Sequence, residues 1–351
     1  MGELNPVTSP QDAARFGILQ AEVMDMYIGA SGKPLRPVAP PHFYLSSAWE
    51  LDGYLVARDT VFDEQGRLSL SADTVFYGVL VHRKADATQF AAIIRGTEGF
   101  KEWLIDGEVQ HSHVPYYPGG QCGNVEEGFF RVYYTMQFLD ADDDARTRVM
   151  PAWEGIKNKV GDGSLIVSGH SLGAALATYL AFDLASLGGL DQNLQACFFA
   201  SPRPGDKTFA QVFDKNVTRY VVYAYERDVV PHLPPSVVFL PIHIPPEILR
   251  YATLKNVREI TMADANAIIQ DDIHANHHVL CYAAMLDYNA AHACYNGAYT
   301  WSALLARDDD APNCIKGPKK PGLLPDDPCP YAETAQAGIL RGVQPVPSGS
   351  G

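Results

Sequence analysis

The sequence has few of the features that place a protein in a membrane or on nucleic acid. No apolar run among its 351 residues reaches the roughly 20 residues that a transmembrane helix needs. Basic residues are scarce, since 27 lysines and arginines stand against 41 aspartates and glutamates, for a net charge of -14. This balance disfavours nucleic acid and anionic membrane surfaces as partners. A neutral or apolar substrate fits the chain better.

Two further absences concern redox chemistry and compartment. The six cysteines include no CxxC pair, so the usual signal for a zinc site or a redox dithiol is missing. Three of them, Cys294, Cys314 and Cys329, lie in the C-terminal region, where a disulfide of open pairing would form in an exported protein. The first residues carry neither a basic region nor an apolar stretch, so no signal peptide is predicted. The sequence leaves both a cytosolic and a secreted protein open.

What the chain does have is the pattern of an α/β domain. Apolar residues make up 47% of it, enough for a sizeable core. Helices are predicted from an N-cap at Ser9, after the strand at 164–168, and near 276–290. Strands are predicted at 74–84, 88–97, 164–168, 194–201 and 218–226. This alternation predicts a central, mostly parallel sheet flanked by helices over residues 1–305, followed by a Pro- and Asp-rich extension at 306–351.

One short stretch, GHSLG at residues 169–173, indicates a nucleophile. The G-x-S-x-G pattern follows an apolar strand and opens a helix, which is the context of a nucleophile elbow. The glycines remove side chains that would clash where strand and helix meet, and the turn exposes the hydroxyl of Ser171. The backbone amide of Leu172 is then placed to face a developing oxyanion. An ordinary buried turn serine is the alternative.

A serine nucleophile needs a base, and the base needs an acid that orients it. With this elbow the chain order is serine, acid, histidine. Asp228 is the predicted acid because it follows a strand whose end lies at the same edge of the sheet. Glu226, which we place within that strand, and Asp206, which we place in a polar turn, are the competitors.

The base is predicted among the histidines at a helix start, in DDIHANHHVLCY. His277 is favoured, His278 is second and His274 is third. The same Asp and His cluster could instead bind zinc or calcium, although no second ligand cluster accompanies it. We prefer the use of His277 in a triad with Ser171 and Asp228.

Five stretches occur along the chain in this order: IIRGTEGFKEWLID, EEGFFRVYY, VSGHSLGAALA, FFASPRPGDKTFAQVF and ERDVVPHLPP. In this order they resemble the class 3, fungal-type triacylglycerol lipases of the α/β-hydrolase fold. The resemblance runs over residues 76–282, and Tyr282 matches the spacing of the family's final His and Tyr. It implies that Ser171 is the nucleophile, Asp228 the acid and His277 the base.

The resemblance also implies an oxyanion residue and a lid. Thr97, directly after Arg95 and Gly96, matches the family's oxyanion residue, with Leu172 giving the second amide. The segment after Thr97 matches the lid, which covers the site in water and opens at a lipid surface. Its apolar face would consist of Phe100, Trp103, Leu104 and Ile105, for which core packing is the alternative.

The expected activity is hydrolysis of lipid esters through an acyl-enzyme, with no cofactor and no metal. The expected partner is a lipid or other ester at a lipid–water interface, and the oligomeric state is not predicted. Two alternatives keep the triad: a phospholipase A1, and an esterase of soluble or feruloyl-type esters. A third alternative is a binding module that has lost catalysis.

Overall fold

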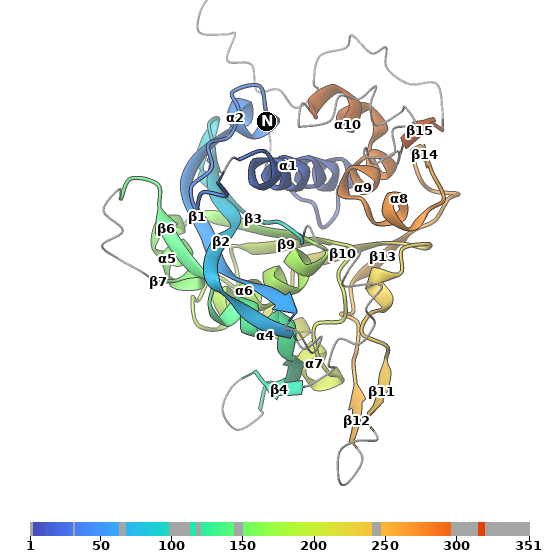
Figure 1. The fold of residues 1–351 in the computed structure, drawn as a ribbon. Coiled ribbons are helices and arrows are strands. Elements are labelled where there is room, and N and C mark those ends of the chain that lie inside the picture. Colours follow the sequence, from blue (N-terminus) through green and yellow to red (C-terminus); the bar gives the residue numbers. More distant parts are fainter. Residues whose placement is uncertain are drawn as a thin grey trace, which may run out of the picture.

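The computed structural model describes residues 3–30, 32–62, 68–97, 113–116, 121–143, 150–240, 247–295 and 315–319. Its centre is a nine-stranded sheet of order β13-β10-β9-β8-β3-β2-β1-β6-β7, with helices on both faces (Figure 1). The strands of this sheet are β1 Trp49–Phe62, β2 Leu68–Arg83, β3 Asp86–Ile94, β6 Gln137–Asp140, β7 Met150–Pro151, β8 Ser164–His170, β9 Leu194–Phe199, β10 Tyr220–Tyr225 and β13 Val257–Ile260.

The sheet has a parallel half and an antiparallel half. Strands β3, β8, β9, β10 and β13 run parallel to one another. Strands β2 and β3 form the predicted hairpin, and β1, β6 and β7 continue the sheet in antiparallel pairs. The parallel half determines the site, because the carboxyl ends of its strands meet at one edge.

Helices cover the two faces of the sheet and bury two separate cores. On one face, α1, α2, α9 and α10 contribute Phe16 and Tyr282 to a buried cluster, and on the other α4 to α7 contribute Tyr179 and Phe209. This layering is that of an α/β-hydrolase, so the predicted fold class is confirmed. The helices are α1 Pro10–Gly29, α2 Tyr44–Ala48, α4 Glu127–Tyr134, α5 Ala152–Val160, α6 Leu172–Ser186, α7 Lys207–Asn216, α8 Ile273–His277, α9 Val279–Leu286 and α10 Tyr288–Cys294, with a 3-10 turn at Val230–His232.

Three smaller strand pairs lie outside the main sheet. They are β4 His113–Pro115 with β5 Asn124–Glu126, β11 Val237–Leu240 with β12 Glu247–Arg250, and β14 Ala267–Ile269 with β15 Ile315–Pro318. The last pair attaches part of the predicted C-terminal extension to the body of the protein. The domain boundary at residue 306 stays a prediction. Among the described residues, no helix combines the length and the apolarity that crossing a bilayer requires.

The late helix expected at 276–290 is instead interrupted twice, and that prediction is wrong in detail. His278 has an extended backbone, with φ -70 and ψ 130, and Asp287 has φ -154 and ψ 94. Both residues cap the helix that follows through their side chains, since His278 accepts from the amide of Leu280 and Asp287 from that of Ala290. As a result, α8 ends at His277, and the residue expected to act as base stands at a helix terminus.

Candidate active site

The parallel strands deliver three of the predicted residues to one edge of the sheet. Ser171 directly follows β8, and Thr97 lies three residues beyond the end of β3. Asp228 lies three residues beyond the end of β10, in the turn before the 3-10 helix. His277 comes from outside the sheet, as the last residue of α8. Residues far apart in the chain therefore reach one edge because their strands are parallel.

Ser171 occupies a backbone conformation that serine rarely adopts. Its φ of 58 and ψ of -131 lie on the positive-φ side, which costs a side-chain-bearing residue about 1–3 kcal/mol. Two hydrogen bonds hold it there: its amide donates to the Phe199 carbonyl at 3.1 Å, and its carbonyl accepts from the Ala174 amide at 2.9 Å. This is the geometry of the predicted elbow, and Leu172 is the first residue of α6.

The glycines of the motif are required by close backbone contacts. A Cβ added at Gly169 would lie 2.2 Å from the Gly173 carbonyl oxygen, and one at Gly173 would lie 2.3 Å from the Arg95 oxygen. A Cβ at Gly96 would lie 3.2 Å from the Cβ of Ser171. The segment that leads to Thr97 therefore packs backbone-to-backbone against the elbow.

Asp228 and His277 are in direct contact. Nδ1 of His277 lies 2.9 Å from Oδ2 of Asp228, and both side chains are buried. The Tyr282 hydroxyl donates to the same Oδ2 at 2.7 Å, and the Val230 amide donates to Oδ1 at 3.0 Å. Because burying a carboxylate is costly unless donors surround it, these contacts explain why Asp228 is tolerated in the interior. With Nδ1 bonded to the acid, Nε2 is the nitrogen left to accept a proton.

His170, between the motif glycine and the serine, supports His277. Its Nε2 lies 2.7 Å from the His277 carbonyl oxygen and so donates to it, and the two ring centroids are 4.6 Å apart. Burial holds the pKa of His170 well below its usual value, and the neighbouring His277 lowers it further. A neutral His170 can hold the backbone of His277 without opposing its protonation. The sequence marked His170 only as a variable position of the motif.

The other two candidate histidines do not contact Asp228 in the same way. His278 points its Nδ1 at the amide of Leu280, 3.2 Å away, and caps α9. Burial lowers the pKa of His278 to about 4, with His277 adding to the effect. His274 is exposed in the first turn of α8. The structure thus brings His277, and neither neighbour, to the predicted acid.

Leu172 directly follows Ser171 in the chain, and the oxyanion role of Thr97 and Leu172 stays a prediction, while the predicted lid is outside the described residues. Thr97 is half-buried and follows Gly96, which packs on Ser171. Phe100, Trp103, Leu104 and Ile105 belong to the part of the chain that the structure does not describe. Their role as a lid stays a prediction.

Comparison with known proteins identifies the family. Residues 91–238 match the family model described as Lipase (class 3). Phospholipase A1-II 3 of Oryza sativa subsp. japonica is 26% identical over 282 residues, covering 68% of this chain and 67% of that protein. A lipase of Rhizomucor miehei is 31% identical over 148 residues, covering 41% of this chain and 37% of that protein. Over residues 91–238, the chain therefore has the sequence pattern of the class 3 lipase family.

The resemblance predicted from the motifs is thereby confirmed. This class 3 lipase is a serine hydrolase of carboxylic esters, the enzyme class expected from its sequence. Among solved structures, it is similar to the Rhizomucor miehei lipase propeptide complex, at 18% identity and a TM-score of 0.44, covering 79% of this chain and 78% of that chain.

The two competing acids of this lipase serve local structure. Glu226 was expected within a strand, but it lies directly after β10. There its Oε1 accepts a hydrogen bond from the Met262 amide at 3.0 Å. Asp206 caps α7 by accepting from the Phe209 amide at 2.8 Å. Among the described residues, no group of three or more His, Cys, Asp or Glu side chains is arranged to hold a metal ion.

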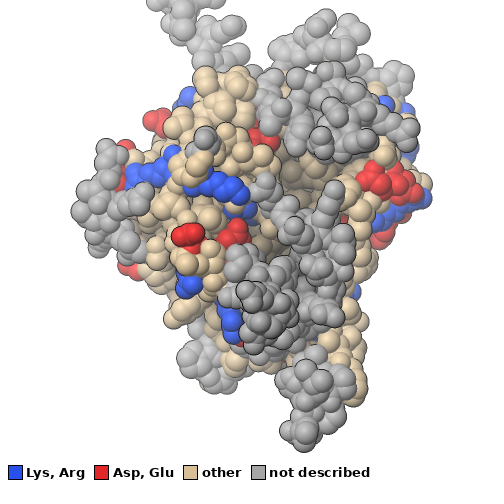
Figure 2. All heavy atoms as spheres, viewed as in Figure 1, with Lys and Arg blue, Asp and Glu red and all other residues tan. Residues whose placement is uncertain are grey.

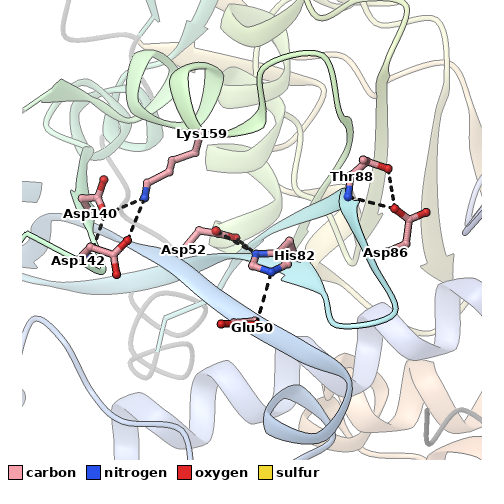
Figure 3. A network of polar contacts seen from close by, with 8 residues as sticks. All are labelled: Glu50, Asp52, His82, Asp86, Thr88, Asp140, Asp142 and Lys159. Carbon is pink, nitrogen blue, oxygen red and sulfur yellow. Dashed lines mark hydrogen bonds and ion pairs between the residues drawn. The ribbon is translucent and has the colours of Figure 1, made fainter. Parts of the chain in front are cut away.

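A second histidine–carboxylate pair lies on the antiparallel half of the sheet (Figure 3). Nδ1 of His82 is 2.9 Å from Asp52, while its Nε2 is 3.6 Å from Glu50. Burial raises the pKa of Asp52, and His82 opposes that rise. Because both ring nitrogens face carboxylates, His82 has no nitrogen placed to take a proton from a hydroxyl. With the Lys159–Asp140 ion pair nearby, the group ties β1, β2, β6 and α5 together.

Proposed function

We propose that this lipase cleaves acyl esters of lipids, with Ser171 as nucleophile, His277 as base and Asp228 as the acid that orients the base. The observation that carries the proposal is the 2.9 Å contact between His277 and Asp228, at the sheet edge where Ser171 stands in a strained elbow. Triads are recognised by such geometry and roles rather than by sequence position.

The reaction follows from these roles. Nε2 of His277 takes the hydroxyl proton as the oxygen of Ser171 bonds to the acyl carbon. The amides of Thr97 and Leu172 stabilise the oxyanion, an effect typically worth about 3–4 kcal/mol per donor. The imidazolium then returns its proton to the leaving alcohol as the ester bond breaks. Water repeats the sequence: its proton passes through His277 to Ser171, and the carboxylic acid leaves.

The charge distribution supports a neutral or zwitterionic lipid as substrate. The net charge is -14, which opposes association with anionic surfaces. On the face shown in Figure 2, uncharged residues make up most of the described surface, and charged side chains lie in separate groups. An apolar lid at Phe100, Trp103, Leu104 and Ile105 would bring the site to a lipid–water interface.

Phospholipid is the second candidate substrate. The rice phospholipase A1-II 3 aligns with 68% of this chain, whereas the Rhizomucor miehei lipase aligns with 41%. The broader match favours an acyl ester of a glycerophospholipid beside triacylglycerol. Both substrates use the same residues, so only a comparison of rates separates them.

An oxidising compartment is part of the proposal. Cys281 and Cys294 are disulfide-bonded, whereas Cys122 and Cys197 are free. Disulfides are rare in the cytosol and persist in exported proteins. These bonds favour export over the cytosolic alternative that the sequence left open.

A substrate panel with Ser171→Ala tests the proposal. Wild-type protein is expected to hydrolyse p-nitrophenyl butyrate, emulsified triolein and phosphatidylcholine vesicles, and to react with a fluorophosphonate probe. Ser171→Ala should reduce each rate by about 10⁴-fold or more and abolish labelling. Ser186→Ala, at the other end of α6, is the matched control and should keep full activity. A folded wild-type protein that neither labels nor hydrolyses any ester would support the binding-module alternative instead.

A further inference from the structure

Arg95 is a buried cation directly beside the proposed oxyanion segment. Its side chain is 1% exposed, and its guanidinium lies between two tyrosine rings. The guanidinium carbon is 3.5 Å from the ring centroid of Tyr27 in α1 and 4.5 Å from that of Tyr77 in β2. Nε donates to the Phe76 carbonyl at 2.8 Å, and Nη1 donates to the Gly96 carbonyl at 2.7 Å. Four contacts therefore fix the position of the Arg95 side chain.

Within the described residues, no carboxylate forms an ion pair with this guanidinium. Among the described residues, the charge is balanced by two carbonyl oxygens and by the negative faces of two aromatic rings. Nη2 is buried and has no hydrogen-bond partner in the described part of the chain. Burying a cation in this way costs free energy, so an arginine used only for packing would be a poor choice. Its position next to Gly96 indicates what the charge does.

We propose that Arg95 is a positioning residue that fixes the peptide plane between Gly96 and Thr97, and hence the amide that stabilises the oxyanion. In a trans peptide the carbonyl and the N–H point in opposite directions. Because Nη1 of Arg95 holds the Gly96 carbonyl, the amide of Thr97 is held pointing away from the guanidinium. This inference rests on the proposed role of Thr97 in ester hydrolysis.

The contacts of the neighbouring backbone make that orientation relevant to Ser171. The ideal Cβ position of Gly96 is 3.2 Å from the Cβ of Ser171, so this peptide lies against the nucleophile. The Arg95 carbonyl oxygen would be 2.3 Å from a Cβ at Gly173, which sets the same segment against the start of α6. A rotation of the Gly96–Thr97 peptide would therefore reorient the Thr97 amide, which follows the residue that packs against Ser171.

The inference also gives the N-terminal helix a part in the active site. Tyr27 belongs to α1, which lies outside the residues that match the family model. Its ring is buried and stacks on the guanidinium. We call the contacts of Arg95 with Tyr27, Tyr77 and the Gly96 carbonyl the clamp. Helix α1 thereby contributes Tyr27 to the clamp, in addition to covering the sheet.

Kinetics of Arg95 variants on p-nitrophenyl butyrate test the proposal. Arg95→Lys keeps a charge but loses the planar fork, and Arg95→Met loses both. Each is expected to lower kcat by about 10–100-fold and to leave KM within about twofold, because the amide acts only in the transition state. Arg83→Lys is the matched control: Arg83 is also buried, but it is the last residue of β2 and pairs with Asp86, the first residue of β3, so its variant should keep kcat. An unchanged kcat in Arg95→Met would overturn the proposal.

Substitutions at Tyr27 test the same clamp from the other side. Tyr27→Phe keeps the ring and should leave kcat within about twofold, whereas Tyr27→Leu should lower kcat by about 3–10-fold. If Arg95→Met does not fold, judged by circular dichroism and thermal unfolding, then Arg95→Lys and the Tyr27 pair decide. Equal kcat values for the two Tyr27 variants, together with wild-type kcat in Arg95→Lys, would contradict the clamp.

A crystal structure of Arg95→Lys separates failure of this inference from failure of the proposed function. If wild-type protein hydrolyses no ester, the proposed function fails whatever Arg95 does. The clamp predicts a second orientation of the Gly96–Thr97 peptide in the variant, with the Ser171 elbow unchanged. A single, wild-type orientation would refute the clamp even if ester hydrolysis is established.

Discussion

Two buried carboxylates of this lipase have opposite surroundings. Asp228 accepts hydrogen bonds from His277, Tyr282 and the Val230 amide. Glu126 is buried at the start of α4 and accepts from the Phe129 amide at 2.7 Å. Burial raises the pKa of Glu126 to about 7, although the backbone donors at Phe129 and Gly128 oppose the rise. Both carboxyl groups are buried, but Asp228 meets two side-chain donors and a backbone amide, whereas the donors described at Glu126 belong to the backbone.

Glu126→Gln should remove a pH dependence of stability. The folded-state pKa of about 7 lies above the ordinary 4.5, so Glu126 stabilises the fold at pH below 4.5 and loses that effect as the pH rises to about 7. The difference between these two pKa values corresponds to about 3 kcal/mol at most in the free energy of unfolding. Urea unfolding at pH 5 and pH 8 should show a larger loss for wild type than for Glu126→Gln, which keeps a capping oxygen but cannot ionise. Parallel pH profiles would contradict the prediction.

At the scale of elements, the junction of β8 and α6 determines what the sheet edge can do. Helix α6 begins at Leu172, directly after a serine with positive φ, so its amino terminus points at the nucleophile. Strand β8, helix α6 and the end of β3 lie so close together that backbone atoms contact backbone atoms at Gly169 and Gly173. The elbow is thus a packing arrangement between two elements as well as a local turn.

Gly173→Ala should damage this junction. Its Cβ would lie 2.3 Å from the Arg95 oxygen and 2.4 Å from the Ile94 oxygen, and neither backbone atom can move aside cheaply. We expect a loss of about 2–3 kcal/mol in unfolding free energy and loss of ester hydrolysis. Gly29→Ala at the end of α1 is the control, because nothing lies within 4 Å of the added Cβ. The measurements are urea midpoints and rates on p-nitrophenyl butyrate; a wild-type midpoint for Gly173→Ala would refute the packing argument.

At the scale of the whole molecule, the histidine depends on helices at the end of the chain. Helix α9 packs against α1, and α8 precedes it with His277 at its end. Figure 1 shows α8, α9 and α10 grouped beside α1 on one face of the sheet. Disulfide-bonded Cys281 and Cys294 lie in α9 and α10, so covalent links restrain the part of the fold that presents the base.

Reduction should therefore lower both stability and activity. Disulfides typically contribute about 2–4 kcal/mol, mainly by restricting the unfolded chain. With tris(2-carboxyethyl)phosphine, the melting temperature should fall by several degrees and the rate should fall at temperatures below the wild-type transition. Alkylation of denatured, unreduced protein, followed by mass spectrometry, should modify Cys122 and Cys197 only among the four described cysteines. Modified Cys281 or Cys294 would rule out the bonds.

Much of the parallel half and its edge could be predicted from local patterns. The apolar strand before GHSLG, the two flanking glycines and the small residues of α6 are constraints between neighbours in sequence. The same holds for Ser9, whose hydroxyl accepts from the Asp12 amide at 3.1 Å. Strand β1 was not predicted, although it pairs with β2 along much of its length, since its stability comes from a partner strand.

The sequence by itself predicted the elbow from the neighbouring residues of GHSLG, and it predicted the order of serine, acid and histidine and the family resemblance from short motifs spaced along the chain. It ranked His277 ahead of His278 and His274, but it could not show which imidazole contacts Asp228, or that His170 and Arg95 lie beside the site. Those contacts join residues that are distant in the sequence. They depend on the register of the parallel strands and on the residue at which α8 ends. Tertiary packing therefore brings His277 to Asp228, with α8 ending at that histidine.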